Sequence, residues 1–107
     1  MSVLEKNEID ALGIDEKGNL LMLIIDEMAW KNKNEHLYCL QNKINAYVSF
    51  IDTKQYSKTY PNRILKQYVI KICFLYKIPR KCLRFLKEVN RQLNMYNICV
   101  EYEVENE

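Results

Sequence analysis

The stretch ICVEYEV, Ile98–Val104, alternates strictly between apolar side chains and side chains that are mostly charged. Side chains of a β-strand point in turn to the two faces of a sheet, so this pattern predicts a strand with one buried face and one face in water. The wet face is predicted to carry Cys99, Glu101, Glu103 and Glu105. Because only the other face can then be covered, we expect all helices to pack on one side of the sheet.

The segment before this strand predicts a helix, and the one before that predicts a second strand. Residues 80–96 have apolar side chains at helical spacing, which are Cys82, Leu83, Leu86, Val89 and Leu93. Residues 64–78 alternate as a strand does, and Pro79 ends the pattern. The strand residues that we expect beneath the helices are Tyr68, Ile70, Ile72 and Phe74.

The amino-terminal half predicts a hairpin followed by a helix. The apolar segments 9–14 and 20–28 flank the turn-forming residues DEKGN, in which Gly18 can adopt a positive φ. Residues 20–25 are apolar on both faces, which is typical of a central strand. A helix follows, with Asn34 as its expected N-cap. Its apolar stripe is Leu37, Leu40, Ile44, Tyr47, Val48 and Ile51.

These elements predict a single α+β domain that covers residues 1–107, with the element order ββαβαβ. We expect a two-layer sandwich, in which a four-stranded sheet, mostly antiparallel or mixed, carries both helices on one face. The polar connection at 53–63 is the longest in this arrangement and predicts a loop.

Composition favours a cytoplasmic protein with reduced thiols. Residues 1–10 are polar and acidic, without the apolar segment of a secretory signal. The cysteines, which are Cys39, Cys73, Cys82 and Cys99, match no zinc-binding spacing, so we expect free thiols. The longest apolar run, residues 20–25, is too short to span a bilayer. We therefore expect no cofactor, no metal, no small-molecule substrate and no contact with a membrane.

No pattern of catalytic residues stands out. His36 is the only histidine, and Cys39 follows it by one helical turn without the third group that would orient a nucleophile and its base. We expect His36 to be a solvated residue at the start of a helix. The carboxylate pairs at 15–16 and 26–27 lie in a predicted turn and at a strand end, where solvent keeps both groups ionised. We therefore expect the chain not to be an enzyme.

Charge is polarised along the chain, although the net charge is only +2. Residues 37–98 carry 12 lysines or arginines against 2 acidic residues, while both ends of the chain are acidic. The residues that could bind a basic protein partner are Asp26, Glu27, Trp30, Glu101, Glu103 and Glu105. Two simpler interpretations stay open. The strand glutamates could pair with Lys71 and Lys77, and Trp30 could belong to the core.

The second helix offers a different surface. Its basic face consists of Arg80, Arg84, Lys87 and Arg91. Four cations on one helix face could bind the phosphates of a nucleic acid, although no aromatic side chains for base stacking are interleaved with them. A solvated helix face explains the same pattern.

Two features of the sequence resemble those of a known family. One is the segment EHLYCLQNKINAYVSFI at 35–51, preceded by Trp30. The other is the placement of Tyr60-Pro61 and Phe85-Leu86 among the predicted elements. Over nearly the full chain these features resemble a family of small uncharacterised bacterial domains, some of which are similar to immunity proteins of contact-dependent growth inhibition toxin systems. The resemblance carries over no functional residue, and the basic centre of this chain departs from the usual composition of such domains.

The resemblance implies an immunity protein that neutralises a cognate toxin domain, in particular a nuclease, by blocking it. The charge pattern is compatible with this function, because acidic side chains can compete for the cations with which a nuclease holds phosphates. The alternative is a small nucleic-acid-binding or regulatory module that uses the basic face of the second helix.

Overall fold

A hairpin opens the domain in the computed structural model, which describes residues 9–61 and 64–105 of the chain. Its strands are β1 (Ala11–Ile14) and β2 (Leu20–Asp26). Gly18 has a φ of +84°, and the Asp15 amide donates to the Asn19 carbonyl at 2.9 Å. The predicted hairpin and the positive φ at Gly18 are therefore confirmed. Glycine adopts this backbone conformation without strain, because it has no side chain.

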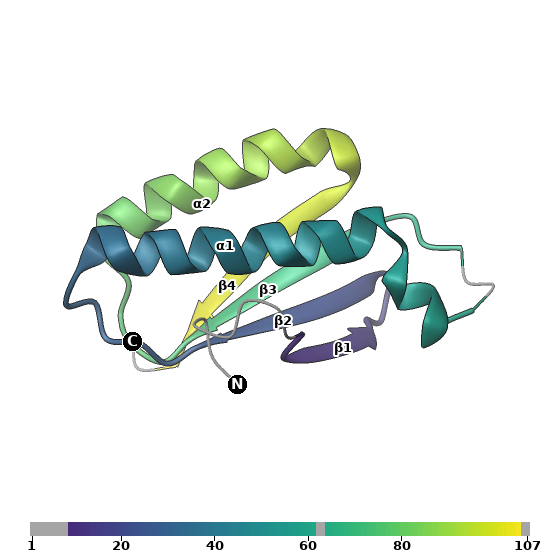
Figure 1. Cartoon of the computed structure of the whole chain (residues 1–107), viewed down its shortest axis with the longest axis horizontal. Coiled ribbons are helices and arrows are strands. Elements are labelled where there is room, and N and C mark those ends of the chain that lie inside the picture. Colours follow the sequence, from purple (N-terminus) through teal and green to yellow (C-terminus); the bar gives the residue numbers. More distant parts are fainter. Residues whose placement is uncertain (1–8, 62–63, 106–107) are drawn as a thin grey trace.

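The sheet continues through β3 (Tyr68–Phe74) to β4 (Ile98–Val104), in the spatial order β1-β2-β3-β4. β1 and β2 are antiparallel, whereas β2 and β3, and β3 and β4, are parallel. Each parallel step requires a crossover, and the helices α1 (Lys33–Asp52) and α2 (Arg80–Leu93) provide them. Both helices cover the same face of the sheet (Figure 1). The predicted ββαβαβ order and two-layer α+β fold are confirmed, with a mixed sheet.

Several element ends differ from the sequence prediction. The N-cap of α1 is Asn32, whose side chain accepts from the Glu35 amide at 3.1 Å, so the predicted cap at Asn34 is wrong. β3 is shorter than the predicted strand at 64–78. Two short 3-10 helices were also not predicted, η1 (Gln55–Lys58) in the connection after α1 and η2 (Asn94–Tyr96) after α2. Residues 62–63 of the predicted loop at 53–63 lie outside the described residues.

The core lies between the helices and one face of the sheet. Every second residue of β2 is buried, as predicted for a central strand covered by helices. The residues expected beneath the helices are buried at Ile70, Ile72 and Phe74 and half-buried at Tyr68. In α2, Cys82 and Leu86 face the core. Leu83 is 41% exposed, so its predicted place in the apolar stripe is wrong.

A buried polar network fastens α1 to the outer edge of β2. The Asp10 carboxylate accepts from the Ile25 amide at 2.7 Å and from Lys43 Nζ at 3.1 Å. The Tyr47 hydroxyl donates to the Leu23 carbonyl and accepts from the Asp10 amide. Burial raises the pKa of Tyr47 well above its ordinary value, so the hydroxyl keeps the proton that it donates. These side chains continue the hydrogen bonding along β2 beyond the amino-terminal end of β1.

The network predicts that replacing Lys43 by methionine destabilises the fold by about 3–5 kcal/mol, because the buried Asp10 carboxylate loses its cation. Lys71→Met is the matched control. Its partner Glu103 is largely exposed, so that substitution costs at most about 1 kcal/mol. Urea unfolding monitored by circular dichroism measures both values. Equal losses for the two variants would contradict the structural role of the buried pair.

Candidate functional site

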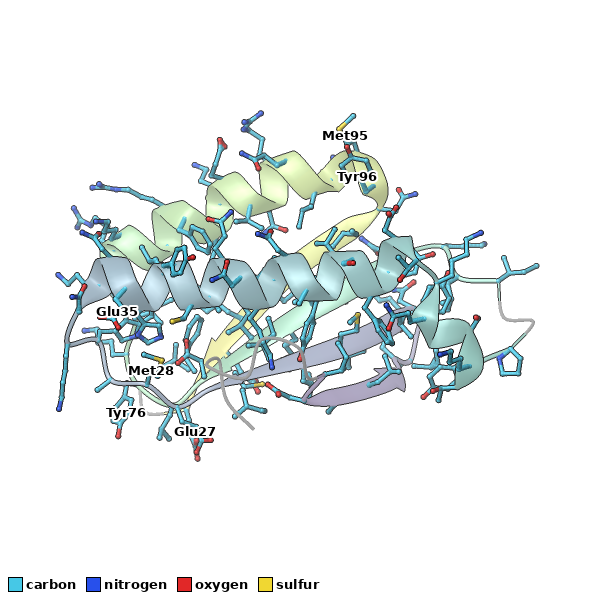
Figure 2. All side chains as sticks on the ribbon, viewed as in Figure 1. Glu27, Met28, Glu35, Tyr76, Met95 and Tyr96 are labelled. Carbon is cyan, nitrogen blue, oxygen red and sulfur yellow. The ribbon has the colours of Figure 1, made fainter. Side chains whose placement is uncertain are left out.

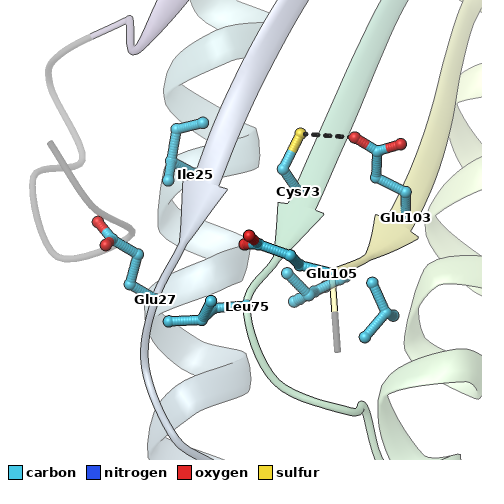
Figure 3. A pocket seen from close by; sticks show the side chains of 8 residues that line it. Ile25, Glu27, Cys73, Leu75, Glu103 and Glu105 are labelled. Carbon is cyan, nitrogen blue, oxygen red and sulfur yellow. Dashed lines mark hydrogen bonds between the residues drawn. The ribbon is translucent and has the colours of Figure 1, made fainter. Parts of the chain in front are cut away.

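A hollow lies on the open face of the sheet, where the parallel strands β2, β3 and β4 reach their carboxyl ends (Figure 3). Its volume is about 420 Å³. The lining residues are Ile25, Glu27, Cys73, Phe74, Leu75, Glu103, Val104 and Glu105. We call this feature the acidic hollow, since three carboxylates surround a largely apolar surface.

The register of the strands builds this hollow. Ile25, Cys73 and Glu103 are lateral neighbours on β2, β3 and β4, and their side chains point to the open face. Two backbone hydrogen bonds extend the ladder past the strand ends. The Leu75 amide donates to the Asp26 carbonyl at 2.9 Å, and the Glu105 amide donates to the Phe74 carbonyl at 2.8 Å. The side chains after the regular strands are therefore held in place at the rim.

The three carboxylates have different surroundings. Glu103 lies 3.4 Å from Lys71 Nζ and accepts a long hydrogen bond of 3.6 Å from the Cys73 thiol. The pairing with the neighbouring strand, which the sequence left open, is thus observed between Lys71 and Glu103. Within residues 9–61 and 64–105, neither Glu27 nor Glu105 forms an ion pair. Glu27 points away from the body of the domain (Figure 2). Two carboxylates are therefore available to an incoming cation.

Cys73 is a poor nucleophile in this environment. Burial and the charge of Glu103 raise the pKa of its thiol. The thiolate is the reactive form of cysteine, so a raised pKa disfavours nucleophilic chemistry near neutral pH. None of the four cysteines, which are all described, is paired in the structure. The described part of the chain also contains no group of three or more histidine, cysteine or acidic side chains that could hold a metal ion.

Asp26 and His36 are buried, which contradicts two predictions. Asp26 is 1% exposed, so it is not part of a solvated pair and cannot touch a partner. His36 is also 1% exposed, and its Nε2 lies 2.6 Å from Asp26 Oδ2. The solvated histidine predicted at the helix start is therefore wrong. Its spacing to Leu40, four residues later, placed it on the apolar stripe of α1, and this was the signal that sequence reasoning missed.

Trp30 belongs to the same buried cluster. Its ring stacks on the His36 ring, with the ring centroids 3.5 Å apart. The centroid of the Phe74 ring lies 6.1 Å from that of Trp30. The core role that the sequence left open is therefore the one observed, and Trp30 is not an exposed anchor. Trp30 Nε1 and His36 Nδ1 are buried without hydrogen-bond partners in the described part of the chain. Asp26 Oδ1 accepts from the Met28 amide at 3.1 Å, which fixes the turn that carries Glu27 to the surface.

Glu101, which was also predicted to bind a partner, does not line the acidic hollow. Glu101 lies on the open face but lines a second hollow of about 310 Å³, together with the hairpin turn. In that turn Asp15 accepts from the amides of Asn19 and Lys17, each at 2.9 Å. These hydrogen bonds lower the pKa of the Asp15 carboxyl, the one from the Asn19 amide most strongly. Glu16 of this pair is exposed, as predicted, whereas Asp15 is half-buried and hydrogen-bonded within the turn.

The basic face of α2 is exposed on the helix layer. All four cations, Arg80, Arg84, Lys87 and Arg91, are exposed. Arg91 binds Glu88 of the same helix through Nε and Nη2, both at 2.8 Å. This bidentate pair partly neutralises the charge of the basic face at the carboxyl end of α2. The acidic hollow lies on the opposite face of the sheet, so the two candidate surfaces are separated by the thickness of the domain.

The contrast between Asp26 and its neighbour gives a direct test of this assignment. Asp26→Ala leaves His36 and the Met28 amide without their acceptor in a buried place, which costs about 3 kcal/mol of folding stability. Glu27→Ala removes an exposed side chain and changes stability by less than about 0.5 kcal/mol. Chemical unfolding of both variants measures the difference. A mild effect at Asp26 would contradict its structural role.

Comparison with known proteins identifies the chain by family alone. The structure has no helix that is long and apolar enough to cross a membrane within its described residues. No curated protein and no solved structure matches the chain significantly. A family described as "Family of unknown function (DUF6572)" matches residues 1–106, and the chain therefore belongs to this family.

Proposed function

We propose that this domain is a binding protein without catalysis, which neutralises a cationic protein by covering it with the acidic hollow. In its specific form, the domain is a cytoplasmic immunity protein of a bacterial contact-dependent growth inhibition system. The partner is then the cognate toxin, a nuclease domain. The observation that carries the proposal is the convergence of Glu27, Glu103 and Glu105 around one hollow.

The composition of the hollow supports protein binding. Protein interfaces combine an apolar centre with polar groups at the rim. Here Ile25, Leu75 and Val104 provide apolar surface between the carboxylates. Carboxylates that lack a cation of their own attract a basic partner from a distance and accelerate its association. A nuclease needs cationic groups to hold phosphates, so an inhibitor that presents carboxylates competes for the same groups.

The environments of the reactive side chains support a function without catalysis. A general base must reach its substrate, but His36 is buried beneath Trp30 and hydrogen-bonded to Asp26. Cys73, which does line the hollow, has a raised pKa and a carboxylate beside it. Neither residue is placed as the nucleophile or the base of a covalent reaction.

The basic face of α2 supports a second candidate function, in which the domain binds nucleic acid or regulates another molecule. Arg80, Arg84 and Lys87 are exposed on one helix, without acidic partners in the described part of the chain. The bidentate pairing of Arg91 with Glu88 weakens this candidate, because a phosphate would have to compete with that carboxylate. We therefore favour the acidic hollow.

The two functions make opposite predictions for charge variants. The double variant Glu27→Lys/Glu105→Lys reverses both unpaired carboxylates of the hollow, and we expect it to weaken binding to the toxin encoded beside this protein by about 1–3 kcal/mol per contact. The matched control, Arg84→Ala/Lys87→Ala, should change the affinity by less than about threefold. Biolayer interferometry at two salt concentrations measures affinity and association rate, and circular dichroism checks the fold.

The opposite result would support the second candidate. Tight binding to RNA with a steep dependence on salt, lost in Arg84→Ala/Lys87→Ala and kept in Glu27→Lys/Glu105→Lys, would contradict the proposed inhibitor function.

A further inference from the structure

The second edge of the sheet, β4, has a backbone that is only partly protected. The Tyr68 amide donates to the Asn97 carbonyl, and the Glu105 amide donates to the Phe74 carbonyl. In a parallel ladder this pattern directs the backbone groups of odd-numbered β4 residues to β3. The amides and carbonyls that point away from the sheet are therefore those of Ile98, Val100, Tyr102 and Val104.

A side chain of α2 closes this edge at one position. Asn90 Nδ2 donates to the Val100 carbonyl at 2.8 Å, and the Val100 amide donates to Asn90 Oδ1 at 2.7 Å. The carboxamide thus takes both hydrogen bonds that a neighbouring strand would form there. Natural proteins protect exposed strand edges by such coverage, because an open edge pairs with other chains.

The protection ends after Val100. α2 and β4 meet near η2 and diverge toward the carboxyl end of β4 (Figure 1). Tyr102 is 45% exposed, and Val104 is half-buried. Within the part of the chain that the structure describes, the outward amides and carbonyls of these two residues have no hydrogen-bond partner. An unpaired edge of this kind accepts an extended segment as an additional strand.

The side chains beside this edge define the segment that fits. Glu101, Glu103 and Glu105 stand on the open side, whereas Tyr102 and Val104 alternate with them. Directly opposite residues of paired antiparallel strands point to the same face and interact. The fitting segment therefore alternates basic residues, which lie opposite the glutamates, with apolar ones. A second copy of β4 fits poorly, since glutamates would lie near glutamates.

We propose that the carboxyl-terminal half of β4 binds an extended segment of the partner, with alternating basic and apolar residues, as an additional antiparallel strand of the sheet. This inference rests on the proposed function, because the charge of the segment follows from a cationic partner. The added strand lies beside the acidic hollow and extends the same open face.

The backbone contribution can be tested separately from the side chain. Tyr102→Pro removes the outward amide and leaves the ladder to β3 intact, since proline is tolerated where its nitrogen faces away from the sheet. Tyr102→Ala is the matched control, because it loses the same ring contact with Phe74 but keeps the amide. The probe is a capped peptide of alternating lysine and valine, with a glutamate-for-lysine peptide as the charge control.

We expect the lysine peptide to slow the hydrogen exchange of the Tyr102 and Val104 amides in NMR spectra of the isotope-labelled protein. Tyr102→Pro should weaken its binding about tenfold or more, and Tyr102→Ala should retain most of it. The glutamate peptide should not bind. These results together support strand addition.

Other outcomes overturn the inference and can be separated from failure of the proposed function. Lysine-peptide signals confined to the acidic hollow, or equal binding by Tyr102→Pro and Tyr102→Ala, would overturn strand addition and leave the proposed function standing. No binding of the lysine peptide would also overturn strand addition. Equal binding of the glutamate peptide would count against both proposals. Toxin binding by the charge variants tests the proposed function independently.

Discussion

The direction in which the chain crosses the sheet is the constraint on which the rest of the structure depends. From β2 the chain passes through α1 to β3 and through α2 to β4, each time to the next parallel strand in the same direction. Parallel crossovers are almost always right-handed, so two steps in one direction place both helices on one face. The other face remains open, and the carboxyl ends of three strands meet at its edge. The acidic hollow is a consequence of this topology.

Buried polar groups then fix the details of that edge. The carboxylate of Asp26 connects His36 of α1 with the Met28 amide, so the helix and the turn after β2 are held by one group. Trp30 stacks on His36 and packs against Phe74, near the end of β3. This cluster supports the turn from which Glu27 extends. Adjacent residues therefore have opposite surroundings, since Asp26 is buried in the domain and Glu27 is exposed to solvent.

The local patterns of the sequence predicted the architecture, because alternation and helical spacing report which face of each element is buried. The alternation of Ile98–Val104 correctly indicated one open face, and Glu101 and Glu103 are exposed there. Leu83 was misplaced because the sheet and the other helix cover the first turn of a helix incompletely, which helical spacing does not record. The N-cap was placed two residues too late, at Asn34, because two asparagines flank Lys33 and both fit a cap by sequence.

The candidate site was less accessible to sequence reasoning. Glu27, Glu103 and Glu105 were predicted as partner-binding residues, but only the strand register brings them together. Asp26 was grouped with them because a carboxylate next to another in the sequence looks equally solvated. Its burial depends on His36, ten residues later, and that pairing follows from tertiary packing rather than from local pattern. The closure of β4 by Asn90 is equally invisible before the fold is known.

We propose that the open face of the sheet, and not the helix layer, binds the partner. Hydrogen–deuterium exchange of the domain, alone and in complex with the proposed toxin domain, tests this proposal. We expect binding to slow exchange in the carboxyl-terminal half of β4 and in the turn after β2, while α2 exchanges at the same rate. Slowed exchange confined to α2 and the exposed side of α1, with β4 unchanged, would contradict it.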